Sequence, residues 1–227
     1  YPSSSPPIST IDLPTTPTVF DIIVPDNYSC IQLAVDYASI GDVIFVKQGV
    51  YNETVVIDKS LWLVGEDKQT TIIDGHSLAS SFSILADCVN VTGFQVTNTP
   101  IPAEGNPWFS WEYVPAKHLA SMQINRSRGC NIYGNLFTNG SVGVDLSDSI
   151  GNNVFDNEFI INSQGINISG QNHYVARNQI LNCDVGGIGL VIDSSHNIIV
   201  NNTITKGTSG IWLKSGENNT LRANIME

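Results

Sequence analysis

The sequence predicts an all-β solenoid, a stack of similar coils, and three observations support this prediction. Five segments share the pattern of an apolar residue, two variable residues, an asparagine, one variable residue and a second apolar residue. A glycine followed by apolar residues in alternation recurs at residues 143–146, 165–168, 187–190 and 210–213. The chain has 227 residues, of which 41% are hydrophobic, so it is long enough to bury one sizeable core.

The five repeated asparagines lie 22, 21, 24 and 22 residues apart, and they are Asn135, Asn157, Asn178, Asn202 and Asn224. This spacing is too long for a heptad and predicts coils of about 22 residues, stacked so that their apolar residues form continuous columns. Each carboxamide both donates and accepts hydrogen bonds, so stacked copies can bond to one another or to the backbone at a tight corner. We therefore assign this column a structural role, as a ladder.

The first part of the chain divides into an arm and the start of the solenoid. Residues 1–25 are rich in Ser, Pro and Thr and are predicted to form an extended arm, whereas residues 26–227 are assigned to the solenoid. The arm contains a β-prone stretch at residues 18–24, which either supplies a strand to a neighbouring chain or pairs with its own first coil. Residues 30–40 have mostly helical apolar spacing that ends at Gly41, which predicts a short helix capping the solenoid.

Short strands are expected after this helix, at residues 43–46, 54–57, 61–64 and 71–73, because apolar runs there alternate with turn residues. The repeat appears once more near Val91, with Phe94 in the position of the asparagine. An insertion is expected at about residues 99–118. Its aromatic residues are candidates for contact with a carbohydrate or a partner protein, or for a small satellite core, and they are Trp108, Phe109, Trp111 and Tyr113.

Charge and hydropathy exclude two classes of partner. Acidic residues outnumber basic ones 21 to 10, and the formal net charge of −11 disfavours nucleic acids and other polyanions. No apolar run approaches the roughly 20 residues of a membrane span, so membrane insertion is not expected. The chain begins at Tyr1 without a recognisable signal peptide, and we expect a processed, secreted protein.

Export would allow two covalent modifications. Asn-x-Ser/Thr sequons make eight asparagines candidates for glycosylation, although solenoid turns also favour these residue types; they are Asn27, Asn52, Asn90, Asn125, Asn139, Asn167, Asn201 and Asn218. The four cysteines form no CxxC pair, and an even number favours disulfides outside the cell. Cys88 and Cys130 occupy nearly equivalent coil positions and are expected to pair. Cys30 and Cys183 either pair, stay free or bridge to another chain.

A family resemblance enters through the first coils. Residues 31–35, 41–46, 49–53, 57–61 and 72–75 resemble the opening of right-handed parallel β-helix proteins of the pectin-lyase-like superfamily, of the NosD-like and archaeal surface-protein type. The resemblance covers about residues 22–227 and implies a single-stranded, right-handed parallel β-helix. It implies little about function, because this fold is used by lyases, hydrolases, binding modules and surface structures.

The NosD-like resemblance also raises the question of copper. His173 and His196 fall near the same coil corner in adjacent turns, which makes them weak candidates for a copper or zinc site. No Cys or Met accompanies them, while His76 and His118 lie elsewhere. The alternative is that a corner histidine replaces an asparagine. We expect no cofactor.

The functional expectation is a non-enzymatic protein of a cell surface or extracellular assembly. No pair of adjacent aspartates stands on a predicted strand, as a hydrolase of this fold would need, and basic residues for a lyase are few in the regular coils. Asn224 begins another coil without a visible polar cap, so we expect a homo-oligomer or polymer formed through this coil or through the arm. The alternative is a module that binds or degrades carbohydrate with the aromatic insertion, and the expected partner is then a glycan.

Overall fold

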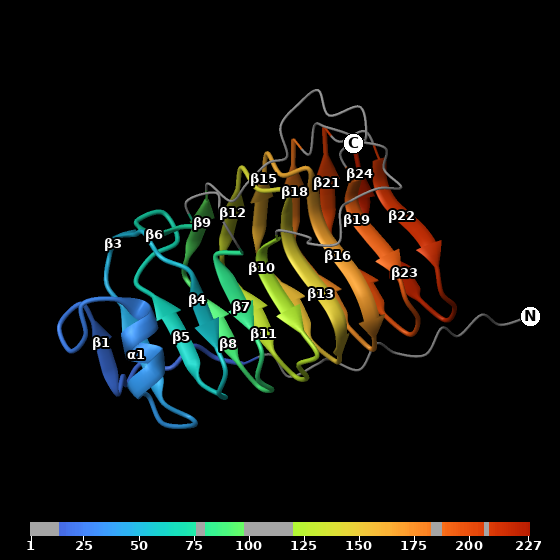
Figure 1. Ribbon diagram of the computed structural model, residues 1–227. Coiled ribbons are helices and arrows are strands. Elements are labelled where there is room, and N and C mark those ends of the chain that lie inside the picture. The colour runs from blue at the N-terminus through green and yellow to red at the C-terminus, as the bar shows by residue number, and fades with distance from the viewer. Residues whose placement is uncertain (1–13, 76–79, 98–119, 183–187, 207–208) are drawn as a thin grey trace, which may run out of the picture.

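The computed structural model describes residues 14–75, 80–97, 120–182, 188–206 and 209–227. In this part of the chain the strands form three parallel sheets, stacked coil upon coil along one axis (Figure 1). Every pair of neighbouring strands in the described part is parallel, and in the later coils the paired residues lie about 22 positions apart, as Ile132 and Val154 do. The predicted β-helix is therefore confirmed.

The strand bounds follow the three sheets. The nine-stranded sheet contains β1 (Ile22–Val24), β2 (Val43–Val46), β5 (Trp62–Gly65), β8 (Asn90–Thr92), β11 (Asn131–Tyr133), β14 (Asn153–Phe155), β17 (Tyr174–Ala176), β20 (Ile198–Val200) and β23 (Thr220–Arg222). The eight-stranded sheet contains β3 (Gly49–Tyr51), β6 (Thr71–Asp74), β9 (Gln95–Thr97), β12 (Leu136–Thr138), β15 (Glu158–Ile160), β18 (Gln179–Leu181), β21 (Thr203–Thr205) and β24 (Ile225–Met226). The seven-stranded sheet contains β4 (Val55–Ile57), β7 (Phe82–Ile84), β10 (Ala120–Asn125), β13 (Val142–Ile150), β16 (Gln164–Gln171), β19 (Ile188–Asp193) and β22 (Ser209–Ser215).

The interior is filled by columns of equivalent apolar side chains. In the nine-stranded sheet Ile132, Val154 and Val175 pair in register, and all three are fully buried. In the eight-stranded sheet the rings of Phe137 and Phe159 stack with their centroids 4.9 Å apart. Each coil thus covers the apolar face of the next one, and each fully buried aliphatic side chain stabilises the stack by about 2 kcal/mol.

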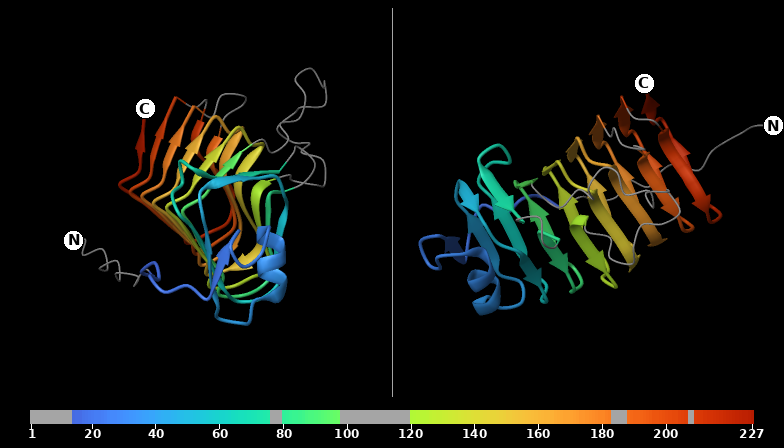
Figure 2. Two further views of the ribbon diagram at one scale, coloured as in Figure 1. Left: turned by 90° about the vertical axis from the view of Figure 1, so that its left-hand side faces the viewer. Right: turned by 45° about the horizontal axis from the view of Figure 1, so that its top comes forward.

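A helix closes the first coil. Helix α1 (Ile31–Tyr37) lies at the end of the stack and buries Ile31, Ala34 and Val35 (Figure 2). The two Glu53 carboxylate oxygens accept hydrogen bonds from the backbone N–H groups of Ile31 and Gln32, each at 2.9 Å. Because the first N–H groups of a helix lack partners within it, this carboxylate caps the helix from the loop before β4.

The arm contacts the outside of the nine-stranded sheet. Strand β1 pairs with β2 of its own chain, so of the two alternatives for this stretch, pairing with its own first coil is confirmed. Upstream, Phe20 stacks on Phe45 of β2, and the Thr16 and Tyr133 hydroxyls are 2.9 Å apart. Since β2 and β11 are three strands apart, about 14 Å, residues 16–20 must be almost fully extended and cross the strands.

The corners between sheets carry two long ladders. At each of these corners the residue before the rung is in the left-handed region of backbone conformation. Asp156, Arg177 and Asn201 are examples, with φ near +55°. At the corner between β14 and β15, Asn157 Oδ1 accepts the N–H of Asn135 at 3.0 Å, and the next coil repeats this bond. All five predicted asparagines lie in this column, and its first acceptor bonds the N–H of Phe94.

A second ladder lies at the corner between the seven-stranded and nine-stranded sheets, and it does not consist of asparagine alone. Its rungs are Cys130, Asn152, His173, Asn197 and Asn219. Each residue lies five positions before an asparagine of the first ladder, as 152 does before 157. The residue types of this column change from rung to rung, so the repeat of asparagines in the sequence does not reveal it.

Candidate functional site

The outer face of the seven-stranded sheet carries a row of polar side chains. On β10, β13 and β16, Ile124, Leu146 and Ile168 point into the core. The residues between them in sequence point outward because side chains alternate along a strand. One outward column contains Gln123, Asp145 and Asn167, and the neighbouring column contains Asn125, Ser147 and Ser169. We call these two columns and their continuation onto β19 and β22 the polar face.

Asp145 organises the centre of the polar face. Its two carboxylate oxygens accept hydrogen bonds from Asn167 Nδ2 at 2.7 Å and from Ser147 Oγ at 2.6 Å. The Asp145 side chain is 0% exposed although its strand position faces outward. A carboxylate only accepts hydrogen bonds, so it fixes the orientation of both donors. The amide oxygen of Asn167 is thereby left to accept a bond from elsewhere.

The polar face continues onto β19 and β22. Val191 and Trp212 follow Asn167 in register, so an indole lies in the same outward column. Asp193 accepts a hydrogen bond from Ser215 and forms an ion pair with Lys214 at 3.2 Å. The Ser215 hydrogen bond, followed by Lys214, lowers the pKa of Asp193. This carboxylate is therefore ionised over the ordinary pH range.

A pocket lies at the end of the polar face, where β13, β16 and β19 reach the corner of the coil. Its volume is about 390 Å³, and it is lined by Asp148, Ser149, Ile150, Gly170, Gln171, Asp193, Ser194 and Ser195. We call it the corner pocket. A register shift between Ser147 and Ser149 places Asp148 in a left-handed conformation, with φ of +49°. Such a bulge redirects a side chain at the edge of a sheet, and here it places a carboxylate at the pocket.

Two buried polar atoms beside the pocket lack hydrogen-bond partners in the described part of the chain. They are the Ser149 hydroxyl and, apart from a contact with the Ser149 backbone carbonyl, the Nε2 atom of His173. His173 Nδ1 accepts the N–H of Asn152 at 3.1 Å, so the neutral ring carries its proton on Nε2. Burial lowers the pKa of His173 from 6.5 to about 4. Gly170 makes room for this ring, because a Cβ there would lie 2.7 Å from Nε2.

The two candidate metal histidines occupy different positions of the corner. His173 is a rung of the second ladder, where it replaces an asparagine as the alternative interpretation expected. His196 is exposed, precedes the next rung and has its Nε2 3.3 Å from Asn218 Nδ2. His76 and His118 lie outside the described residues. Residues 14–75, 80–97, 120–182, 188–206 and 209–227 contain no group of three His, Cys, Asp or Glu side chains that could hold a metal ion.

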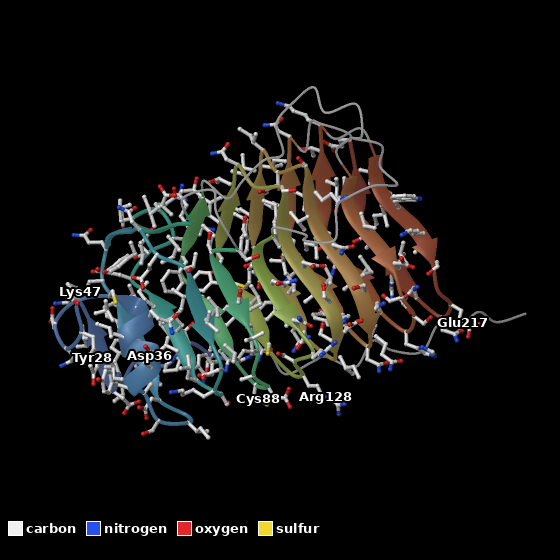
Figure 3. All side chains as sticks on the ribbon, viewed as in Figure 1. Tyr28, Asp36, Lys47, Cys88, Arg128 and Glu217 are labelled. Carbon is white, nitrogen blue, oxygen red and sulfur yellow. The ribbon has the colours of Figure 1, made fainter. Side chains whose placement is uncertain are left out.

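The expected disulfide between Cys88 and Cys130 is not formed, and the register explains why. Asn90 pairs with Asn131, so Val89 lies opposite Cys130 and Cys88 opposite Gly129. This offset of one residue sends the two side chains to opposite faces, and Cys130 is buried while Cys88 is exposed. Cys88 and Arg128 mark this edge of the solenoid in Figure 3. Cys30 is also free, and Cys183 lies outside the described residues.

Other predicted sites are distributed around the solenoid. The sequon asparagines 27, 52, 139, 201 and 218 are exposed, 125 and 167 are partly buried, and 90 is buried. Their glycosylation stays a prediction. The aromatic residues 108, 109, 111 and 113 lie outside the described residues. None of the described helices is long and apolar enough to cross a membrane.

A protein-family model matches this chain and shows the family to which it belongs. The family model described as "Periplasmic copper-binding protein (NosD)" matches residues 80–227, more than half of the chain. The chain belongs to the NosD family. Membership in a periplasmic family indicates an exported protein, which agrees with the expected export. No curated protein matches the chain.

Solved structures share the fold of this NosD-family chain at low sequence identity. Pectin methylesterase PemA from Erwinia chrysanthemi is 12% identical with a TM-score of 0.55, over 86% of this chain and 82% of its own. An alginate lyase from Paenibacillus sp. str. FPU-7 is 13% identical with a TM-score of 0.56, over 86% and 93%. A pectin methylesterase from Aspergillus niger is 14% identical with a TM-score of 0.51, over 93% and 87%. These matches confirm the pectin-lyase-like fold.

The described side chains of this NosD-family chain do not fit a copper ion. The Nδ1 atom of His173 is already bonded to backbone, and its Nε2 is enclosed. Burial raises the pKa of the Cys130 thiol to about 12, so it stays protonated and is not a thiolate ligand. Cys88 and His196 are exposed and do not belong to any three-ligand group in the described ranges.

We did not predict the polar face from the sequence, although its positions occur in the repeated segments. The repeated segments that begin at Gly143 and Gly165 place Asp145 and Asn167 two residues after the glycine, between apolar residues. These middle positions are the outward column. In the next coil the register aligns Gly165 with Gly189, because Ile166 pairs with Leu190. The sequence repeat that aligns Gly165 with Gly187 is therefore wrong by two residues.

Proposed function

We propose that this NosD-family protein is an exported carbohydrate-binding protein that holds an oligosaccharide on the polar face and in the corner pocket. The observation that carries the proposal is the pair of partly exposed side chains Ser147 and Asn167, which the buried Asp145 holds by hydrogen bonds on the sheet that also carries Trp212 and the pocket. This function corresponds to the carbohydrate alternative from the sequence, but its residues lie on the sheet instead of the insertion.

The chemistry of the face suits sugars. Sugar hydroxyls donate and accept hydrogen bonds, and Asn167, Gln123 and Gln171 provide amide groups of both kinds. Trp212 stands in the same outward column and is partly exposed, and sugar rings stack on indole rings. A pocket of about 390 Å³ falls within the usual range for small-ligand sites.

Binding is proposed instead of hydrolysis because of the acid chemistry. A glycoside hydrolase needs a carboxylic acid whose pKa is raised so that it can protonate the leaving oxygen. At Asp193 the pKa is lowered, by Ser215 first and then by Lys214. This side chain therefore serves as a hydrogen-bond acceptor for a ligand. Within the exported class, we place the protein outside the cytoplasmic membrane, in the periplasm or at the cell surface.

The test is a calorimetric titration of the full chain with a panel of uncharged oligosaccharides. We expect saturable binding that Trp212→Ala and Asn167→Ala each weaken by about fivefold, since a ring contact and a hydrogen bond each contribute about 1 kcal/mol. Gln179→Ala is the matched control, because Gln179 is an exposed polar residue on the eight-stranded sheet. If no oligosaccharide binds, or if the control weakens binding equally, the proposed function is wrong.

Copper is included as a competing ligand in the same titration, because the family description names it. We expect no stoichiometric binding that depends on His173 or Cys130. Stoichiometric copper binding that His173→Asn abolishes would replace carbohydrate with copper as the ligand of this corner.

Assembly into homo-oligomers or polymers remains a separate proposal. Strand β1 pairs with β2 of its own chain but is the edge strand of the nine-stranded sheet, so this pairing does not exclude association at its other edge. Size-exclusion chromatography with light scattering at several concentrations tests it. A single monomer mass at every concentration would rule out self-assembly.

A further inference from the structure

We infer that the corner pocket recognises the ammonium group of an amino sugar within a bound oligosaccharide. The inference rests on the proposed carbohydrate function and names the class of sugar that the pocket selects. It follows from the charge of the pocket, from an unpartnered hydroxyl in its wall and from the absence of the ligands that a metal ion would need.

The pocket carries two carboxylates and no cationic lining residue. Asp148 comes from the bulge of β13, and Asp193 comes from the end of β19. Lys214 pairs with Asp193, but it does not line the pocket. Asp148 is exposed and forms no ion pair within the described part of the chain, not even with Arg126 in the preceding coil. The pocket therefore attracts a cation, and the net charge of the chain acts in the same direction.

The wall of the pocket contains an independent indication of a ligand. Ser149 is 1% exposed, and its hydroxyl has no hydrogen-bond partner within the described ranges. Leaving a buried hydroxyl without a partner costs about 1 to 3 kcal/mol, and native proteins seldom leave one so. A hydroxyl oxygen accepts a bond from an ammonium, whose three N–H donors match the two carboxylates and this hydroxyl in number.

The second ladder packs against the wall of the corner pocket and fixes its shape. Gly170 in its wall cannot carry a side chain, because a Cβ there would lie 2.2 Å from the Ser149 carbonyl oxygen and 2.7 Å from His173 Nε2. His173 itself is fixed by Asn152 and Asn197 on either side. A preformed site loses little conformational freedom when it binds, which favours selectivity between similar sugars.

An ammonium suits the pocket better than a divalent cation does. Calcium takes about six to eight oxygen ligands, usually including several carboxylates. The described residues gather no group of three metal-ligating side chains at the pocket or elsewhere. A single positive charge is sufficient for Asp148, because Lys214 already compensates Asp193 in part.

The experiment compares two tetrasaccharides of equal length on the full chain, one of glucosamine and one of N-acetylglucosamine, at a pH where the amine is protonated. We expect the glucosamine oligomer to bind about tenfold more tightly, and added salt to reduce this preference. Asp148→Asn should abolish the preference, so that the two oligomers bind the variant with equal affinity. Asp58→Asn, an exposed aspartate far from the pocket in the sequence, is the matched control and should keep the preference.

The outcomes separate the inference from the proposed function. Equal or tighter binding of the acetylated oligomer, or a preference that survives Asp148→Asn, overturns the ammonium site. Failure of both tetrasaccharides also overturns it, while the carbohydrate function stands if an uncharged oligosaccharide binds in the wider panel. Thermal unfolding by circular dichroism verifies that each variant is folded, and Asp193→Asn is the second variant, expected to reduce the preference as well.

Discussion

The two ladders solve the same structural problem with different chemistry. Both hold a sharp corner by bonding each rung to the backbone N–H of the rung before it. The first ladder uses asparagine from Asn135 to Asn224, and a carboxamide does not titrate. The second uses an imidazole at His173, whose acceptor nitrogen is also the site of protonation. Equivalent geometry therefore produces one corner that is indifferent to pH and one that is not.

The largest effect is expected from removing a rung of the first ladder. In Asn157→Ala, the N–H of Asn135 and the carbonyl of Ile132 lose buried hydrogen-bond partners. Two buried groups without partners cost about 4 kcal/mol together. Urea denaturation at neutral pH measures this loss, and Gln179→Ala on the solenoid surface should change the free energy of unfolding by less than about 0.5 kcal/mol. A loss below about 1 kcal/mol for Asn157→Ala would show that the ladder contributes little.

Acid should destabilise the second ladder. Because burial lowers the folded-state pKa of His173 from 6.5 to about 4, the unfolded chain binds the proton first as the pH falls. Stability is therefore complete above pH 6.5 and decreases until about pH 4, by about 3 kcal/mol in all.

The matched variant for this pH effect is His173→Asn, because asparagine already fills the neighbouring rungs 152 and 197. Denaturant unfolding at pH 7, 5.5 and 4 should show a smaller loss of stability for the variant than for the native protein. Identical pH dependence in the two proteins would mean that His173 does not set it.

A smaller effect is expected from Gly170→Ala, at the contact between the second ladder and the pocket. The added methyl group would meet the Ser149 carbonyl oxygen and His173 Nε2, with an expected cost of about 2 kcal/mol. Gly151→Ala is the control from the same corner, since a Cβ there meets nothing within 4 Å and φ is +66°. Its cost should be only about 1 kcal/mol, from the left-handed backbone. Equal melting temperatures for the two variants would argue against the close contact.

The smallest effect concerns reactivity instead of stability, at the first rung of the second ladder. The Cys130 N–H bonds Asn152, and its thiol is buried with a pKa of about 12. A thiol reagent at neutral pH should modify Cys88 in the native protein, whereas Cys130 should react only after unfolding. Peptide mass mapping identifies the modified residue. Rapid native modification of Cys130 would show that this corner opens readily.

The fold was predictable because the coils of a solenoid appear in the sequence as a repeat of nearly constant length. Asn135 and its equivalents repeat one residue type at nearly constant spacing, and each lies where the ladder needs it. The second ladder has the same spacing, but its rungs include Cys130 and His173 as well as asparagines. A repeat of different residue types in one structural role is harder to recognise in a sequence than a repeat of one residue type.

The polar face and the cysteines were harder to predict because both depend on register. A shift of one residue moves a side chain to the other face of a sheet, and this shift separates Cys88 from Cys130. The corner pocket depends on the bulge at Asp148, which interrupts the alternation of β13. A β-bulge is a shift in pairing with the neighbouring coil, so no local sequence pattern predicts it.

The contact between Thr16 and Tyr133 has a consequence for how the solenoid unfolds. In a stack where each coil touches only its neighbours, terminal coils can fray one at a time, and the chain behaves as a one-dimensional array. The arm instead joins residues 117 positions apart and crosses from β2 to β11. Such a long-range tie couples the opening of the first coils to that of the middle ones. The N-terminal half should therefore exchange its amide hydrogens as one cooperative unit.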